Sequence, residues 1–291
     1  MALAGVVAEL ALVVVTMLVV ATLVIIGPRQ FVTAFSDFRW RVRACTLPLV
    51  VLGVVLVLRW STQDLVPRLS WRVLGNNVTP HIVSLEQTLF GTNPVAVLQS
   101  YQTPELTAVF AFVYLYGYAF LLIFPFIAYF ALEEMDEFST LVLAFTANYA
   151  IGLVCYVLFI AYGPRNLDPV LFEGLLYDAM PRAYYLTNTV NENTNVFPSL
   201  HTSLSVTVFL LAWHTREKYP LWVPVSGVIA FAVVLSTMYL GIHWFSDVVA
   251  GTVLAAVSVY IATNYTIEGI LESVQRFLAT QVERLGQPDG K

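Results

Sequence analysis

Long apolar runs separated by short polar connections make up most of the chain. A helix needs about 20 apolar residues to cross the hydrocarbon core of a bilayer, so charge-free runs of roughly this length predict transmembrane helices. Seven apolar runs, of which the last contains the single acid Asp247, lie at residues 10–27, 45–58, 106–132, 138–164, 199–213, 221–240 and 244–266. They predict an all-α, polytopic transmembrane helical bundle of about seven spans, in which residues 1–291 form a single integral membrane domain.

Two of these runs are ambiguous. The run at 45–58 is short unless Arg43 and Arg59, which flank it, extend their side chains towards the membrane surfaces. The run at 10–27 has the length of a signal peptide, but Glu9 is the sole charged residue before Arg29, so a basic leading region is missing. We therefore expect a retained helix there.

Two further segments have the pattern of amphipathic helices. In residues 267–285, isoleucine, leucine and valine recur every three or four positions, and charged residues occupy the opposite side. This pattern predicts an amphipathic C-terminal helix that continues from the last span. In residues 80–91, apolar residues at helical spacing predict a helix that lies on the membrane surface.

Composition and charge exclude several classes of protein. Charged residues make up only 11% of the chain and hydrophobic residues 58%, whereas soluble domains carry about 25% charged residues. This deficit excludes an ordinary soluble enzyme and a disordered protein. The net charge is −5 and the 14 lysines and arginines are spread along the chain, so we expect no nucleic-acid partner.

The basic residues also predict which way the chain crosses the membrane. Nine of the 14 lie on the connections at 28–43 and 214–220 and on the C-terminal tail, and the other five lie on the alternate connections. By the positive-inside rule, the more basic side is cytoplasmic. We therefore expect an integral protein of the plasma membrane whose C-terminus is cytoplasmic and whose loops at 61–105 and 163–198 lie outside.

Three ionisable residues are expected to converge at the outer ends of the predicted spans. His201 lies at the start of the fifth run, His243 directly precedes the seventh, and Asp247 follows one helical turn later. Because these helix ends face the same side of the membrane, the three side chains meet at one depth. Ionisable groups at membrane depth are costly and mark functional sites.

The residue types at this point suit phosphoryl transfer. Asp247 can orient His243 through one ring nitrogen and leave the other as a nucleophile or base, and His201 can act as a separate acid. The fifth run begins with a helix N-terminus, which binds anions. Arg165 and Arg182, in the preceding loop, offer forked donors for phosphate oxygens.

Two sequence motifs carry a family resemblance. Residues 197–201, Phe-Pro-Ser-Leu-His, and residues 236–247, Ser-Thr-Met-Tyr-Leu-Gly-Ile-His-Trp-Phe-Ser-Asp, resemble the second and third signature motifs of the PAP2 superfamily, the type 2 phosphatidic acid phosphatases and their relatives. The Pro-Ser-Leu-His form is most similar to the inositolphosphotransferase branch, which includes inositol phosphorylceramide synthase. The resemblance covers a PAP2-like catalytic core of about 140–265.

The resemblance implies a role for each matching residue. His243 matches the family's nucleophile, His201 its general acid and Asp247 the residue that orients the nucleophile. Ser199 and Ser236 match serines of the two motifs and would help to hold phosphate. The family needs no metal or other cofactor. The implied activity is that of a lipid phosphatase or phosphotransferase with a phosphohistidine intermediate. Its substrate would be a phospholipid or a polyprenyl phosphate or pyrophosphate in the membrane, and its acceptor water or an alcohol such as inositol.

Three departures from the family pattern affect these expectations. Leu200 stands where the phosphatase branch has glycine, and Thr237 stands where it has arginine. The first motif, a lysine followed by an Arg-Pro pair, is absent in that form, so Arg165 or Arg182 would supply its charge; we favour Arg165, which directly follows the fourth span. Loss of the arginine removes a charge-assisted bond worth about 1.5–3 kcal/mol and fits the transferase branch better.

Other interpretations of this cluster stay open at the level of the sequence. The three side chains would also suit a polar helix-packing network, or a metal site of two histidines and one carboxylate. For the whole protein, the alternative is a multispan transporter or receptor-like protein without catalysis. A retinal protein is excluded because no lysine lies within a span, and transporters usually place their charges near the midplane.

Overall fold

The structure is a computed structural model that describes residues 2–62, 77–181 and 195–286. Within these ranges the regular elements are helices, accompanied by two isolated β-bridges. The first part of the chain forms α1 (Ala2–Ala21), the π-helical turn η1 (Thr22–Ile26), α2 (Pro28–Ser36), α3 (Phe38–Ala44) and α4 (Thr46–Ser61). The all-α prediction is thus confirmed.

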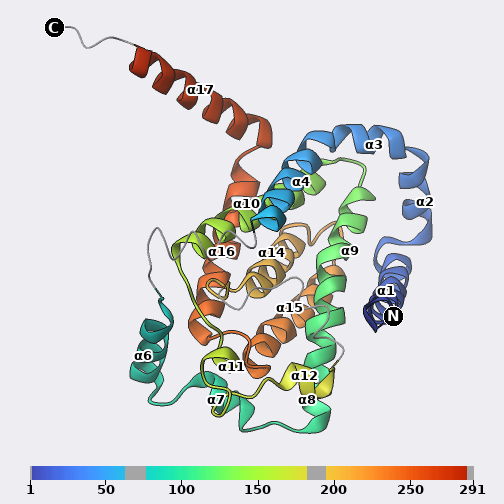
Figure 1. Ribbon diagram of the computed structural model, residues 1–291. Helices are drawn as coiled ribbons and strands as arrows, with labels where there is room; N and C mark the ends of the chain where they lie inside the picture. Colours follow the sequence, from blue (N-terminus) through green and yellow to red (C-terminus); the bar gives the residue numbers. More distant parts are fainter. Residues whose placement is uncertain (1, 63–76, 182–194, 287–291) are drawn as a thin grey trace, which may run out of the picture.

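The remaining helices build the bundle around which the chain is organised (Figure 1). The middle part forms α6 (Thr79–Phe90), α7 (Pro94–Gln99), α8 (Pro104–Phe112), the π-helical turn η2 (Val113–Gly117), α9 (Tyr118–Phe130) and α10 (Asp136–Leu158). The last part forms α11 (Pro164–Leu167), α12 (Leu175–Ala179), α14 (Leu200–His214), α15 (Trp222–Tyr239), α16 (Phe245–Asn264) and α17 (Ile267–Gly286).

Capping residues explain where several of these helices begin. The side chain of Asn93 accepts a hydrogen bond from Val95 N at 2.9 Å at the start of α7. Thr103 caps α8 in the same way. Both helices then have proline as their first residue, where its missing N–H costs nothing. Local sequence signals therefore set the starts of α7 and α8.

Five segments of the described chain are long and apolar enough to cross a membrane. They are Ala4–Ile26, Pro104–Phe130, Asp136–Leu158, Trp222–Tyr239 and Phe245–Asn264. The helices α3 and α4 meet at an angle of 60° and add a sixth span if the bent pair is counted as one. The protein therefore has the helices of a polytopic membrane protein, as predicted.

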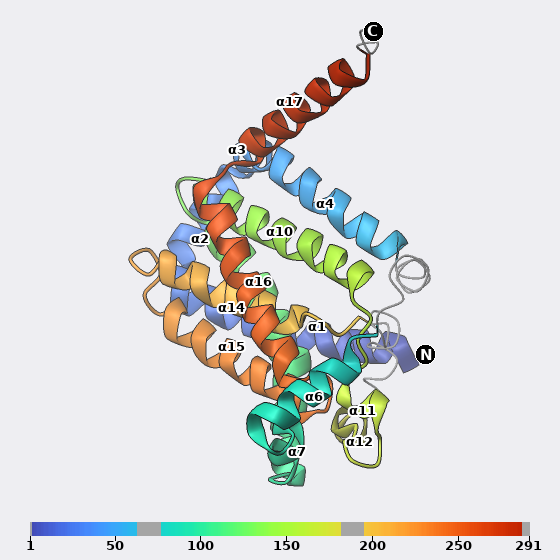
Figure 2. The same ribbon diagram turned by 90° about the vertical axis from the view of Figure 1, so that its left-hand side faces the viewer.

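The predicted count of seven spans is not confirmed, because α4 counts as a span only together with α3 and α14 is short. The run at 199–213 forms a helix of 15 residues, which at 1.5 Å per residue extends about 22 Å. This length is short of the hydrocarbon core, which is about 30 Å thick. α14 packs against α10, α15 and α16 and lies between them (Figures 1 and 2). The apolar residues of α14 therefore pack against neighbouring helices. Its apolar composition does not make it a span, because the helix is too short to cross the membrane.

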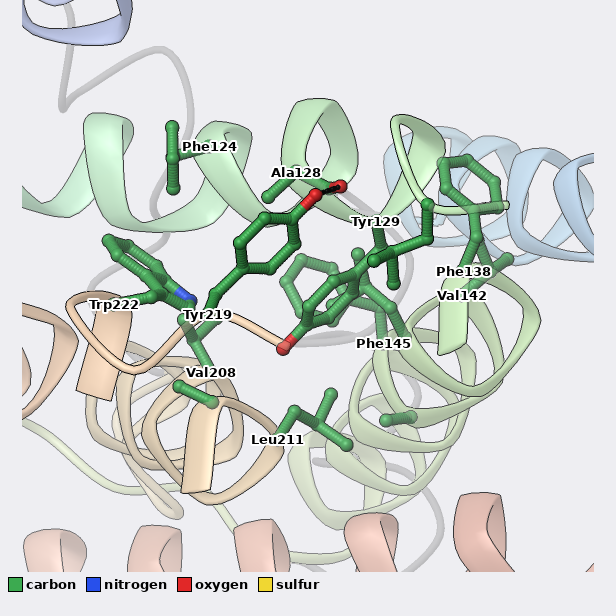
Figure 3. Packing of buried hydrophobic residues seen from close by; sticks show 14 of the residues in the cluster. Phe124, Ala128, Tyr129, Phe138, Val142, Phe145, Val208, Leu211, Tyr219 and Trp222 are labelled. Atoms are coloured by element: carbon green, nitrogen blue, oxygen red, sulfur yellow. Dashed lines mark hydrogen bonds between the residues drawn. The ribbon is translucent and has the colours of Figure 1, made fainter. Parts of the chain in front are cut away.

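Large side chains fill the space around the second half of α14 (Figure 3). Trp222 is fully buried at the start of α15, and its ring centroid lies 4.6 Å from that of Phe124 on α9. The buried Tyr219 hydroxyl donates to the carbonyl oxygen of Ala128 at 2.9 Å. Close packing holds helices together in lipid, so this core fixes α14 against α9 and α15.

The connections separate into two ends of the bundle. α6, α7, α11 and α12 gather at one end, and α3 and α17 lie at the other (Figures 1 and 2). α6 ends at Gly91, which adopts φ +70°, a left-handed conformation that favours glycine. α17 extends away from the bundle with exposed apolar residues such as Phe277 and Leu278.

Candidate active site

A tight turn between α15 and α16 sets the position of His243. Gly241 adopts φ +69°, and a Cβ there would lie 2.6 Å from the carbonyl oxygen of Glu173, so a side chain would not fit. The backbone N–H groups of Ile242 and His243 both donate to the carbonyl oxygen of Thr237 at 3.0 Å. The turn therefore brings His243 back against the end of α15, directly before α16 begins.

Asp247 lies beside His243 in the first turn of α16. His243 Nδ1 and Asp247 Oδ2 are 3.4 Å apart, and His243 is only 4% exposed while Asp247 is fully buried. The same carboxylate oxygen accepts a hydrogen bond from Trp244 N at 2.8 Å. Asp247 is thus held by the start of its own helix and lies beside Nδ1 of His243, which has no hydrogen-bond partner among the described residues. A hydrogen bond with the backbone of Val196 also acts on the imidazole.

Burial and charge keep the His243 imidazole neutral. Desolvation, reinforced by the positive charge of Arg165, lowers the pKa of His243 to about 3. A neutral imidazole has a free lone pair at physiological pH. His243 can therefore act as a nucleophile without first losing a proton.

His201 approaches the same point from α14. Ser199 caps this helix by accepting a hydrogen bond from Thr202 N at 3.3 Å, and Ser199 N donates to the backbone oxygen of Asp247 at 3.1 Å. The starts of α14 and α16 are thereby joined. The ring centroids of His201 and His243 lie 6.0 Å apart, so the structure brings His201, His243 and Asp247 together.

Arg165 is a cation that acts on His243. Its backbone N–H donates to the carbonyl oxygen of Gly241 at 3.1 Å, which ties α11 to the turn that carries His243. Its guanidinium lies 4.8 Å from the ring centroid of Tyr177 and donates to the Tyr177 hydroxyl through Nη2. Nη1 is buried without a hydrogen-bond partner. An unpaired buried donor next to His243 is available to an anion.

The other predicted phosphate ligands are placed differently. The Ser199 hydroxyl caps α14, and the Ser236 hydroxyl donates to the Val233 carbonyl oxygen at 2.7 Å within α15. Both hydroxyls therefore have partners within their own helices. Arg182 lies outside the described residues.

The structure adds three features that the sequence did not reveal. The rings of Tyr114 and Tyr118 lie against His201. The Arg59 guanidinium lies 5.1 Å from the ring centroid of Tyr149 on α10, although the sequence predicted only an extension towards the membrane surface. Glu86 is fully buried. The spacing of four between the two tyrosines was a signal of a shared face, but aromatic residues are common in every apolar run.

Glu86 reaches the start of α16 from the surface helix α6. Its Oε1 accepts a hydrogen bond from Ser246 N at 2.7 Å, and its Oε2 accepts one from Asn93 Nδ2 at 3.3 Å. Burial raises the pKa of the Glu86 carboxyl, although the hydrogen bond from Ser246 opposes this shift. A carboxylate at a helix N-terminus also interacts favourably with the helix dipole. α6 thus supports the helix that carries Asp247.

Within residues 2–62, 77–181 and 195–286, no three histidine, cysteine, aspartate or glutamate side chains are grouped so that they could hold a metal ion. The two histidine rings and Asp247 lie together, and the charge of Arg165, whose Nη1 has no partner among the described residues, acts on His243. Paired imidazoles, an orienting carboxylate and an unpaired guanidinium are together suited to bind and transfer a phosphoryl group.

Comparison with known proteins agrees with this chemistry. The PAP2 superfamily matches residues 80–261. An uncharacterized protein of Methanocaldococcus jannaschii, MJ0662, is 27% identical over 144 residues, or 49% of this chain and 55% of that protein, so the chain spans about half the length of this curated relative. No solved structure matches. Since the family match covers more than half of the chain and includes both histidines and Asp247, the chain belongs to the PAP2 superfamily.

Proposed function

We propose that this protein is a membrane-embedded lipid phosphatase or phosphotransferase that works through a phosphohistidine on His243. The observation that carries the proposal is the convergence of His201 and His243, whose rings lie 6.0 Å apart although they come from different helices. Membership of the PAP2 superfamily supports a phosphatase or phosphotransferase activity in general. The buried Asp247 and the free Nη1 of Arg165 support the finer assignment.

The proposed reaction has two steps. A ring nitrogen of His243 attacks the phosphorus atom of the substrate, and the bond between phosphorus and the lipid oxygen breaks. Burial lowers the pKa of His201 to about 3, so the negative charge of the bound phosphate would have to raise this pKa and bring His201 into its protonated form. His201 then gives its proton to the lipid oxygen, so the lipid leaves as a hydroxyl compound and the phosphoryl group stays on His243. Water or an alcohol then attacks the phosphoryl group and passes its proton to His201, which restores both histidines.

Electrostatic stabilisation would supply much of the rate. Charge spreads over the oxygens of the transferring phosphoryl group, and positioned donors stabilise it. Arg165 has an unpaired donor beside His243, and the N-terminus of α14 at Ser199 supplies a favourable dipole. Asp247 would stabilise the positive charge that forms on His243 when it attacks.

The proposed substrate is a phospholipid or a polyprenyl phosphate or pyrophosphate in the outer leaflet of the plasma membrane. Its head group would enter between His201 and His243, and its tail would stay between the helices. The acceptor is water or an alcohol such as inositol. The Pro-Ser-Leu-His form of residues 198–201 supports the transfer branch, as does Thr237 in place of an arginine.

Mass spectrometry of reaction products tests this proposal. The purified protein is incubated with a panel of phospholipids and polyprenyl phosphates, with and without inositol. We expect loss of phosphate or transfer of a head group with the wild type and no product with His243→Ala. His214→Ala is the matched control, because His214 is exposed at the far end of α14, and it should keep full activity. Turnover by His243→Ala at the wild-type rate contradicts the mechanism.

A further inference from the structure

Two tyrosine rings lie against the imidazole of His201. The Tyr114 ring lies 4.8 Å from it, centroid to centroid, with an angle of 27° between the planes. The Tyr118 ring lies 4.5 Å from it at 41°. Both tyrosines come from the span that contains α8, η2 and α9, whereas His201 belongs to α14. Stacking of this kind restricts the directions that an imidazole plane can take.

The local geometry of that span is unusual at this point. Residues Val113–Gly117 form the π-helical turn η2, and such turns are rare and frequently occur at functional sites. Tyr114 lies within the turn and Tyr118 directly after it, four positions apart and therefore on one face. Tyr114 is only 3% exposed. The turn thus places the rings of Tyr114 and Tyr118 against the same histidine.

Tyr114 also borders the phosphate side of the site. It belongs to the same hydrophobic cluster as Leu175, Leu176 and Tyr177. The Arg165 guanidinium lies over the Tyr177 ring. Tyr114 therefore stacks on His201 and shares a hydrophobic cluster with the tyrosine that the Arg165 guanidinium contacts.

We propose that Tyr114 and Tyr118 form an aromatic clamp that aims the His201 imidazole at the leaving oxygen of the substrate. The clamp rests on the proposed function, because it has a task only if His201 donates a proton. The two tyrosines act through His201 and are positioning residues. Their rings, and not their hydroxyl groups, carry the effect.

This role predicts a dependence on the leaving group. An alkoxide is a poor leaving group and needs a proton, whereas p-nitrophenolate leaves readily without one. General acid catalysis contributes about 10²–10⁴-fold, and a small misplacement can cost about 10²-fold. We expect the double variant Tyr114→Leu/Tyr118→Leu to lower kcat for dioctanoyl phosphatidic acid by roughly 10- to 100-fold. Its kcat for p-nitrophenyl phosphate should stay close to that of the wild type.

Two control variants separate the clamp from a structural role. Tyr114→Phe/Tyr118→Phe keeps both rings and should restore the wild-type rate with the lipid. Tyr116→Leu changes the same residue type in the same turn, but Tyr116 packs on Phe112 and donates to Glu9. It should leave the ratio of lipid to aryl rates unchanged.

The possible results distinguish the clamp from the proposed function. Equal losses with both substrates in a folded leucine double variant overturn the clamp, as does an unchanged rate with the lipid. The clamp is also wrong if His201→Ala slows both substrates equally. A wild-type protein that turns over neither these two substrates nor any lipid of the product panel overturns the proposed function itself.

Discussion

Asp247 faces His243 with one carboxylate oxygen, and its substitution tests the orienting role. Asp247→Asn keeps an oxygen that can accept the bond from Trp244 N, so the variant should fold. It loses the negative charge that would stabilise a positive His243. We expect kcat to fall by about 10²–10⁴-fold, with a smaller change in KM. Steady-state kinetics measure this, with Asp168→Asn as an exposed control. A wild-type kcat for Asp247→Asn contradicts the role.

Arg165 should influence the pH dependence of the reaction. Burial and Arg165 together lower the pKa of His243 to about 3, so the acidic limb of kcat/KM lies far below the ordinary histidine range. Arg165→Gln removes the positive charge that opposes protonation of His243. The pKa of His243 then rises, although burial still keeps it low, and the acidic limb moves to higher pH.

Arg165→Lys is the matched control for this prediction. It keeps the charge, so the acidic limb should stay in place, while the loss of the forked donor raises KM. Profiles of kcat/KM against pH for the three proteins measure both effects. An acidic limb that stays or moves to lower pH in Arg165→Gln shows that Arg165 does not act on His243.

The sequence predicted that three residues would lie near one another, and all three are of types that are rare in a membrane. His201, His243 and Asp247 stand out in apolar runs, and helix direction alone brings their ends together. Tyr114 and Tyr118 did not stand out, because aromatic residues serve packing and interfaces throughout such a chain. Their relation to His201 depends on a contact between helices, which the sequence of either helix does not contain.

At the scale of helices, the approach of α16 to α14 holds the site together. A Cβ at Gly251 would lie 2.5 Å from the carbonyl oxygen of Ser199 and 3.1 Å from Thr202 Cβ. Gly251→Ala should therefore push the two helices apart. We expect a destabilisation of about 1–3 kcal/mol and a loss of turnover, because Asp247 lies one turn away on α16.

Gly53→Ala is the matched control for this substitution. Gly53 lies within α4, and a Cβ there meets nothing within 4 Å. Alanine favours a helix over glycine by about 0.5–1 kcal/mol, so this variant should be as stable as the wild type or slightly more stable. Thermal melting in detergent and kcat measure both variants. Equal melting temperatures and activities for the two alanine variants contradict the close approach.

Helix boundaries could be predicted where the length and composition of a run determine whether it is a span. They were harder to predict where contacts with other helices determine the role of a helix. The long runs became the spans at Pro104–Phe130 and Asp136–Leu158. α14 is as apolar as a span, yet it is short and enclosed by other helices. α6 was expected on the surface, but its Glu86 turns inward to bind Ser246 N. Periodicity defines the faces of a helix without telling which neighbour covers them.

At the scale of the whole molecule, the two ends of the bundle differ in chemistry. The starts of α14 and α16 lie at the end that carries α6, α7, α11 and α12, and α3 and α17 lie at the other end (Figure 2). The strongly basic segment at 38–44 belongs to α3. Since positive residues remain on the cytoplasmic side, we expect the site to face outwards, where it would meet head groups of the outer leaflet.

Cysteine labelling in intact cells tests this orientation. Ser84 on α6 and Ser273 on α17 are both exposed, so Ser84→Cys and Ser273→Cys form a matched pair at opposite ends. In a background that lacks Cys45 and Cys155, a membrane-impermeant maleimide should label Ser84→Cys in intact cells. It should label Ser273→Cys only after permeabilisation. The reverse pattern places the site in the cytoplasm. Labelling of neither position before permeabilisation excludes the plasma membrane, and the substrate would then lie in another leaflet.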